Sequence, residues 1–143
     1  MPLCYHFSMP GLKGFIAGVV LVFASAAQGQ ETCYQAGKPM LRAEIYFGRN
    51  IAGRLGVSER QWAHFLAREL TPRFPDGLTV INGQGQWRGP SGAIVREPSK
   101  IVIVFVPDGL AERERIAAAA AIYKQRFRQD SVAIVTRAVC VTF

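Results

Sequence analysis

Apolar and polar residues alternate at the start of the region that we expect to fold. Every second residue between positions 41 and 47 is apolar, which is the period of a half-buried strand. The glycine-punctuated residues 48–56 predict a loop. Ser58 and Gln61 then have the spacing of a capping box at a helix N-terminus. One apolar stripe predicts the helix itself: Trp62, Phe65, Leu66 and Leu70. We expect Pro72 to end this helix, because the residue before a proline is pushed out of the α region.

The second half of the chain predicts two strands, a helix and a last strand. Residues 78–88 and 93–106 are strand-like, and the turn-forming residues 89–92 separate them. The run 101–106 is apolar on both faces, which is typical of a strand in the middle of a sheet. Pro107 and Asp108 interrupt this pattern. A helix with one apolar side follows, and the β-prone residues 132–143 come last.

This order, β-α-β-β-α-β, predicts an α+β domain with the ferredoxin-like arrangement. We expect a four-stranded antiparallel sheet in the order 4-1-3-2, with both helices on one face. The other face would be open, and the apolar residues of the third and fourth strands would make it apolar. A second subunit or a ligand normally covers such a face. We therefore expect a homodimer that forms through the open sheet face.

The predicted hairpin between residues 78 and 106 contains more polar residues than is usual for strands of a packed sheet. With its turn at residues 89–92, we expect Arg88 opposite Ala93, Gln86 opposite Val95 and Gln84 opposite Glu97. Because side chains alternate between faces, one face would then carry Asn82, Gln84, Gln86, Arg88, Glu97 and Ser99. The other face would carry Trp87 and two glycines, Gly83 and Gly85, which leave the backbone open to close approach. The hairpin therefore predicts a recognition surface beyond the core.

Glu97 has two interpretations. It could be an acid/base group or a charge partner, flanked by Arg88 or Arg96, with Asn82, Gln84 and Gln86 orienting a ligand. It could instead form an ion pair with an arginine of the hairpin, with the glutamines solvated.

Other candidates predict neither a metal nor a cofactor. His64 lies off the apolar stripe of its helix and is a single possible ligand. The pair Ser99-Lys100 is too short a pattern to indicate a Ser–Lys dyad. The pattern Gly83-x-Gly85 lacks the strand and helix that surround a nucleotide-binding loop.

The first 27 residues have the pattern of a secretory signal peptide. Lys13 precedes a short apolar run, and the small residues 24–27 follow it. The run is shorter than the roughly 20 apolar residues of a membrane span. We therefore expect cleavage and no stable membrane span afterwards, with an uncleaved anchor as the alternative. Residues 28–40 would form an N-terminal extension and residues 41–143 the ferredoxin-like domain.

Charge and cysteine content refine this picture. The formal net charge is +7, but the basic residues are scattered, which predicts a solvated mixed surface and no nucleic-acid binding. Cys33 and Cys140 would remain after cleavage, and an even pair in an oxidising compartment favours a disulfide. In the expected fold the end of the last strand adjoins the start of the first, so the two cysteines can meet. Two free thiols are the alternative.

Several segments carry a resemblance to a known family: RAEIYFG (42–48), VSERQWAHFL (57–66), TPRFPDGLTV (71–80), GQWR (85–88), REPSK (96–100), YKQRF (123–127) and CVTF (140–143). Residues 41–143 resemble Domain of Unknown Function 3574, a family of small exported bacterial proteins. The resemblance implies export, to the periplasm or the extracellular space of a bacterium, but no activity. Members are often lipoproteins, whereas this chain has no cysteine directly after its apolar run. The resemblance also directs attention to Arg73, Asp76, Gln86, Trp87, Arg88, Glu97, Ser99 and Lys100.

Three hypotheses about function follow. The first is a non-catalytic binding or interaction module, which associates through its sheet face and takes a small-molecule or protein ligand at the hairpin. The second is a small cofactorless enzyme of the dimeric α/β-barrel type, with Glu97 on the hairpin as acid or base. The third is a purely structural envelope protein. A closed apolar cavity beside Glu97 would favour the enzyme, and a solvated Glu97 would favour the binding module, our working hypothesis. Its candidate ligand-binding residues are Arg73, Asp76, Asn82, Gln84, Gln86, Trp87, Arg88, Ser99 and Lys100.

Overall fold

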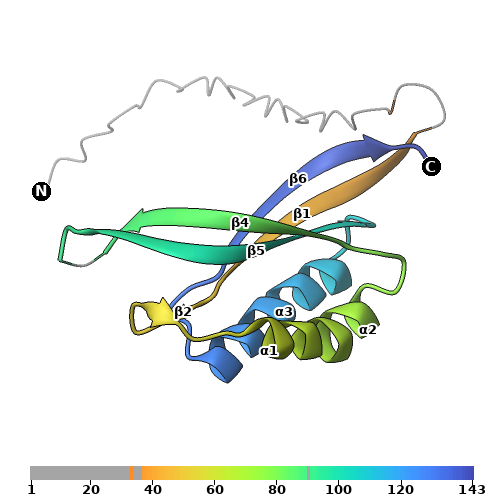
Figure 1. Ribbon diagram of the computed structural model, residues 1–143. Helices are drawn as coiled ribbons and strands as arrows, with labels where there is room; N and C mark the ends of the chain where they lie inside the picture. Colours follow the sequence, from red (N-terminus) through yellow and green to blue (C-terminus); the bar gives the residue numbers. More distant parts are fainter. Residues whose placement is uncertain (1–32, 34–36, 90) are drawn as a thin grey trace, which may run out of the picture. The chain divides into compact units, whose positions relative to one another are not determined.

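The computed structural model describes residues 33, 37–89 and 91–143; the predicted signal peptide, residues 1–27, lies outside them. The described residues form a four-stranded antiparallel sheet with helices on one face (Figure 1). Its strands are β1 (Lys38–Gly48), β4 (Thr79–Arg88), β5 (Ile94–Val106) and β6 (Ala133–Val141), and they lie in the order β4-β5-β1-β6. The predicted α+β class, with an antiparallel sheet of four strands and two helical segments, is confirmed. No helix in this part of the chain has the length and apolar composition needed to cross a membrane.

The first helical segment begins at the predicted capping box. Gln61 N–H donates to Ser58 Oγ at 3.3 Å, and Ser58 N–H donates to Gln61 Oε1 at 2.8 Å. From there the chain runs through α1 (Glu59–Phe65), a π-helical stretch (Leu66–Leu70) and α2 (Thr71–Arg73).

Pro72 lies inside this segment, so the prediction that it ends the helix is wrong. In the π-helical stretch Thr71 N–H donates to the carbonyl of Leu66, five residues earlier. A π-turn is wider than an α-turn, and this extra width gives the proline ring room beside the preceding turn, where it would otherwise meet a carbonyl. The helical path ends at Phe74, whose φ is −125° and ψ 64°.

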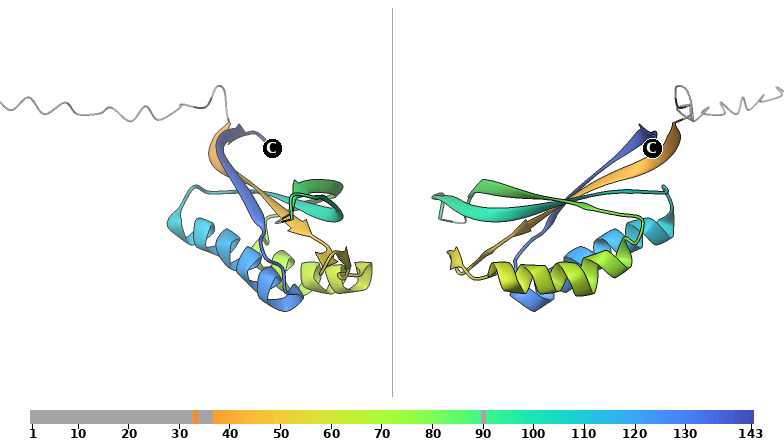
Figure 2. Two further views of the ribbon diagram at one scale, coloured as in Figure 1. Left: turned by 90° about the vertical axis from the view of Figure 1, so that its left-hand side faces the viewer. Right: turned by 45° about the vertical axis from the view of Figure 1, so that its right-hand side comes forward.

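The core lies between the sheet and the helices, which cover one of its faces (Figure 2). The predicted alternation places four side chains of β1 in this core: Leu41, Ala43, Ile45 and Phe47. Rings from the helices pack against them, including Trp62 and Phe65 of the first segment and Tyr123 of α3 (Leu110–Phe127). The ring centroid of Phe65 lies 5.0 Å from that of Tyr123 and 5.7 Å from that of Phe47. Edge and tilted contacts of this kind add to the burial of aromatic surface.

The register of the β4–β5 hairpin differs by one residue from the predicted one. Arg88 pairs with Ile94 rather than with Ala93. Ala93 belongs to the turn, where its carbonyl accepts a hydrogen bond from Gly89 N–H at 2.8 Å. The loop therefore has five residues, 89–93, in place of the expected four. The expected pairs of Gln86 with Val95 and Gln84 with Glu97 are wrong as well, and Arg96 and Pro98 take those positions.

A shift of one residue moves every side chain of one strand to the opposite face. Glu97 pairs with Gly85 and Ser99 pairs with Gly83, so both lie on the open face, away from the helices, together with Trp87. The polar residues expected beside Glu97 share the other face with Lys100 instead: Asn82, Gln84, Gln86 and Arg88. The glycines and the carboxylate, which the sequence placed on opposite faces, therefore lie side by side.

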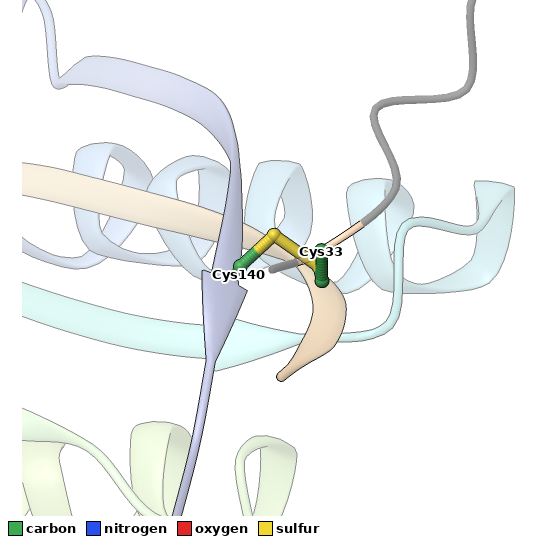
Figure 3. The surroundings of a disulfide bond; sticks show 2 residues. All are labelled: Cys33 and Cys140. Atoms are coloured by element: carbon green, nitrogen blue, oxygen red, sulfur yellow. A yellow bond between two sulfur atoms is a disulfide. The ribbon is translucent and has the colours of Figure 1, made fainter. Parts of the chain in front are cut away.

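A disulfide joins Cys33 to Cys140 across 107 residues of sequence, with the two Cα atoms 5.5 Å apart (Figure 3). Cys140 lies in β6 opposite Pro39 of β1. The bond therefore attaches the segment before β1 to the last strand, at the end of the sheet where β1 begins and near the C-terminus (Figure 1).

Residues 48–56, expected as a loop, contain a small hairpin of β2 (Asn50–Ile51) and β3 (Arg54–Leu55). Its two turn residues, Ala52 and Gly53, have φ values of 51° and 78°. Two successive positive φ angles are typical of the tight type I′ turn that suits a two-residue hairpin loop. The hairpin holds Asn50 next to the β4–β5 hairpin, where the candidate site begins.

Candidate functional site

The Glu97 carboxylate lies on bare backbone at the end of the open sheet face. A Cβ atom added to Gly48 of β1 would be 2.7 Å from Glu97 Oε1, which is closer than real contacts allow, so any larger residue here would displace the carboxylate. Asn50 N–H donates to the other carboxylate oxygen, Oε2, at 3.3 Å. Gly85 flanks Glu97 on the β4 side. The carboxylate is therefore half-buried between two strands that carry no side chains beside it.

Glu97 lines a pocket of about 530 Å³ that three distant segments build. Trp87 and Val95 line it from the β4–β5 hairpin, and Asn50, Ala52 and Gly53 line it from the small β2–β3 hairpin. The loop between α3 and β6 completes the pocket with Arg128, Gln129, Asp130 and Ser131. Six of its ten lining residues have polar or charged side chains, unlike the closed apolar cavity that would favour an enzyme.

Hydrogen bonds around Asn50 hold these segments together. Asn50 Nδ2 donates to the carbonyl of Arg96 at 3.1 Å, and Gln129 Nε2 donates to the carbonyl of Asn50 at 2.7 Å. From the helical layer, the Tyr123 hydroxyl donates to the carbonyl of Gly48 at 2.8 Å. Burial raises the pKa of the Tyr123 phenol well above its usual value, so the hydroxyl keeps the proton that it donates. The pocket is thus fixed from the sheet, the helix and the loop.

The rest of the open face is largely apolar. Ile81, Ile101 and Tyr46 form one row across β4, β5 and β1, and Thr79, Ile103 and Glu44 form the next. Ile81 of β4 and Val135 of β6 are exposed there. A salt bridge of 2.9 Å between Arg42 and Glu44 lies on the same face.

Lys100 lies on the opposite face and belongs to a separate polar cluster. It is 6% exposed, and its amine donates to Glu59 Oε2 at 2.8 Å and to Asn82 Oδ1 at 2.6 Å. The buried Arg49 donates to the other oxygen of Glu59 at 2.5 Å and to the carbonyl of Val57 at 2.9 Å. Two buried cations therefore share one exposed carboxylate. Because buried charges need partners, these contacts are explained by the stability of the fold and indicate no ligand site.

This cluster predicts a pH dependence. The Lys100 amine, which donates to Glu59, and the neighbouring Arg49 lower the pKa of the Glu59 carboxyl. A carboxyl with a lowered folded-state pKa stabilises the fold above its unfolded-state pKa, and this contribution is lost as the pH falls through the folded-state value. We expect the melting temperature of Glu59→Gln to fall less than that of the wild type between about pH 7 and about pH 3. Circular dichroism melts measure this; the control Glu114→Gln, on the exposed side of α3, should follow the wild type. An equal acid-induced fall in Glu59→Gln and wild type would contradict the assignment.

The remaining candidates are dispersed. Arg73 forms a salt bridge of 2.7 Å with Glu69 at the end of the first helical segment. Asp76 lines a different pocket of about 710 Å³, at the far end of the open face. Arg88 donates to the carbonyl of Gly92 at 2.9 Å and so braces the hairpin turn. Gln84 and Gln86 are exposed on the helix-facing side of the hairpin. Of the candidates, the structure brings Trp87 into the pocket with Glu97.

Sequence reasoning missed Gly48, Asn50, Gln129 and Asp130. Gly48 ends an alternating strand, and that position was the one available signal, because a glycine within a strand can mark close approach of another group. Asn50 lies in the short strand β2, whereas Gln129 and Asp130 lie in the loop after α3, and no local pattern links them.

The comparisons identify the family. The family model "Protein of unknown function (DUF3574)" matches residues 42–143. The chain therefore belongs to this family, as its sequence segments indicated. A search of curated proteins found no match.

Solved structures show similarity of fold. A phage SAM lyase in complex with S-methyl-5'-thioadenosine is 17% identical, with a TM-score of 0.57 over 73% of this chain and 90% of that chain. A phage SAM lyase in its apo state is 16% identical, with a TM-score of 0.55 over 78% of this chain and 96% of that chain. CutA from Synechococcus elongatus, complexed with Bis-Tris, is 11% identical with a TM-score of 0.46 over 72% of this chain and 83% of that chain. At these identities the likeness to the lyase concerns the fold alone.

Proposed function

We propose that this protein is an exported, non-catalytic binding module that associates with a second copy of itself through the open sheet face and takes a ligand in the Glu97 pocket. The observation that carries this proposal is the apolar character of the uncovered face. Ile81 and Val135 are exposed on it, and Ile101, Ile103 and Phe105 lie half-buried between them. Contiguous apolar surface of this kind is typical of an interaction site.

The charges on the face favour a second copy as the partner. Arg42 and Glu44 lie near the centre, on β1, and Arg137 lies opposite Arg42 on β6. In a two-fold interface every contact occurs twice: if residue i of one subunit touches residue j of the other, then residue j of the first touches residue i of the second. Opposite charges on one strand, such as Arg42 and Glu44, can therefore pair across the two-fold axis.

Export is part of the proposal. The disulfide between Cys33 and Cys140 is compatible with an oxidising compartment. The predicted signal peptide and the family resemblance support a location in the periplasm or outside the cell.

One observation favours the enzyme as a second candidate. Asp130 brings a second carboxylate into the pocket of Glu97, and pairs of carboxylates in different environments can share acid and base roles. The phage lyase of similar fold bound S-methyl-5'-thioadenosine, so we include thioether nucleosides among the substrates for a first activity screen. Turnover that is lost in Glu97→Gln would replace the non-catalytic proposal with this one.

A matched pair of variants tests the dimer. Ile81 and Ile94 are 45% and 51% exposed on the same hairpin, but they lie on opposite faces. We expect Ile81→Arg to weaken the dimer at least about tenfold, because it buries an unpaired charge in the interface, whereas Ile94→Arg should leave it unchanged. Sedimentation equilibrium over a wide range of protein concentration measures both. A monomeric wild type, or equal dissociation constants for the two variants, would contradict the proposed interface.

A further inference from the structure

The Glu97 pocket combines an indole ring with two carboxylates. Trp87 lines the pocket from the β4–β5 hairpin and is partly exposed, Glu97 lies half-buried between Gly48 and Gly85, and Asp130 lines the pocket from the loop after α3. Asn50 engages one oxygen of Glu97, Oε2, through its backbone N–H. The other oxygen, Oε1, keeps acceptor capacity for a ligand.

This set of groups favours a positive charge. The face of an indole ring attracts cations through its quadrupole, and a carboxylate beside it adds a direct charge interaction. Arg128 brings one positive charge to the lining, so the two carboxylates leave the pocket with one excess negative charge. An anion would meet Glu97 and Asp130 at close range, which disfavours it.

The aromatic wall also selects among cations. Metal ions and simple ammonium groups hold their water strongly, whereas alkylated ammonium groups hold it weakly and gain more from contact with a ring. Gly48 contributes indirectly: because it carries no side chain, the Glu97 carboxylate lies close against the β1 backbone at one side of the pocket.

We propose that the pocket binds a small organic cation of the alkylammonium class, held between the Trp87 ring and the Glu97 carboxylate. This inference rests on the proposed binding role of the pocket and is independent of the proposed dimer. The hydrogen bonds of Asn50 with Glu97, Arg96 and Gln129 fix the geometry before a ligand arrives, which reduces the entropy lost on binding.

Choline and its uncharged carbon isostere, neohexyl alcohol, test the proposal. The two probes have the same shape and differ in charge. In two-dimensional NMR of isotope-labelled full-length protein, the indole N–H signals of Trp62 and Trp87 are separate reporters, and a Trp87→Phe variant assigns them. We expect choline to shift the Trp87 signal and the Gly48 and Asn50 amides, while the buried Trp62 stays unchanged and neohexyl alcohol has no effect.

Charge variants complete the experiment. Glu97→Gln keeps the shape of the side chain and should weaken choline binding at least about tenfold, whereas Glu114→Gln changes the net charge equally on α3 and should not. Equal shifts with both probes, or unchanged binding in Glu97→Gln, would overturn the cation assignment while leaving a ligand pocket. The absence of any shift with choline would overturn it too. The dimer assay with Ile81→Arg does not involve this pocket, so failure of one proposal is distinguishable from failure of the other.

Discussion

Removal of the disulfide is expected to lower the free energy of unfolding by about 2–5 kcal/mol. Cys33 and Cys140 are 107 residues apart, so the bond closes nearly the whole described chain into one loop. A cross-link over a long loop removes many conformations from the unfolded chain, which raises its free energy relative to the fold. Without the bond, the segment before β1 loses its covalent attachment to β6, and we expect the ends of β1 and β6 to separate first.

Urea denaturation of the wild type, the Cys33→Ser/Cys140→Ser double variant and the reduced wild type measures this effect. The double variant and the reduced wild type should have the same, lower stability, and reductant should not change the double variant further. A wild type whose midpoint is insensitive to reductant, with thiols shown to be free, would contradict the expectation.

Replacement of Phe65 by alanine is expected to cost about 3–5 kcal/mol. The Phe65 side chain is fully buried, and its ring touches those of Phe47, Trp62, Tyr123 and Phe127. Truncation leaves a cavity between α1, α3 and β1 that rigid neighbouring rings cannot fill, so the lost packing adds to the lost burial. The loss is comparable to the whole stability of many small domains.

Phe143→Ala is the matched control, because this phenylalanine is 94% exposed. It should change the free energy of unfolding by less than about 0.5 kcal/mol. Thermal and urea melts of both variants give the comparison. Similar losses in the two variants would mean that the aromatic cluster is not the centre of the core.

Helices and strands were predictable from the sequence where burial of one face produces a regular spacing of apolar residues. The alternation of residues 41–47 identified the buried face of β1, because one side of that strand packs on helices. The Ser58–Gln61 capping box identified the start of α1 through side chains close in sequence. Local signals of this kind do not depend on the rest of the fold.

The site was harder to predict because it depends on register and on distant loops. One additional turn residue, Ala93, moved Glu97 to the face of Gly85 and Trp87, and the composition of residues 89–92 is equally compatible with either loop length. The π-helical stretch before Pro72 has no sequence signature that distinguishes it from an ordinary helix end. Asn50 and Gln129 meet because the sheet and α3 place them together, 79 residues apart.

The disulfide and the Glu97 pocket lie at opposite ends of β1, which decides where the protein can be tagged. Cys33 lies where β1 begins, and Gly48, where β1 ends, contacts Glu97. The 11 residues of β1 separate these points by about 35 Å at the usual rise of a strand. A tag or surface linkage placed ahead of Cys33 is therefore attached at the far end of the sheet from the pocket. Immobilisation through that end should leave the pocket accessible, so ligand screening on a sensor surface is practical with the chain attached there.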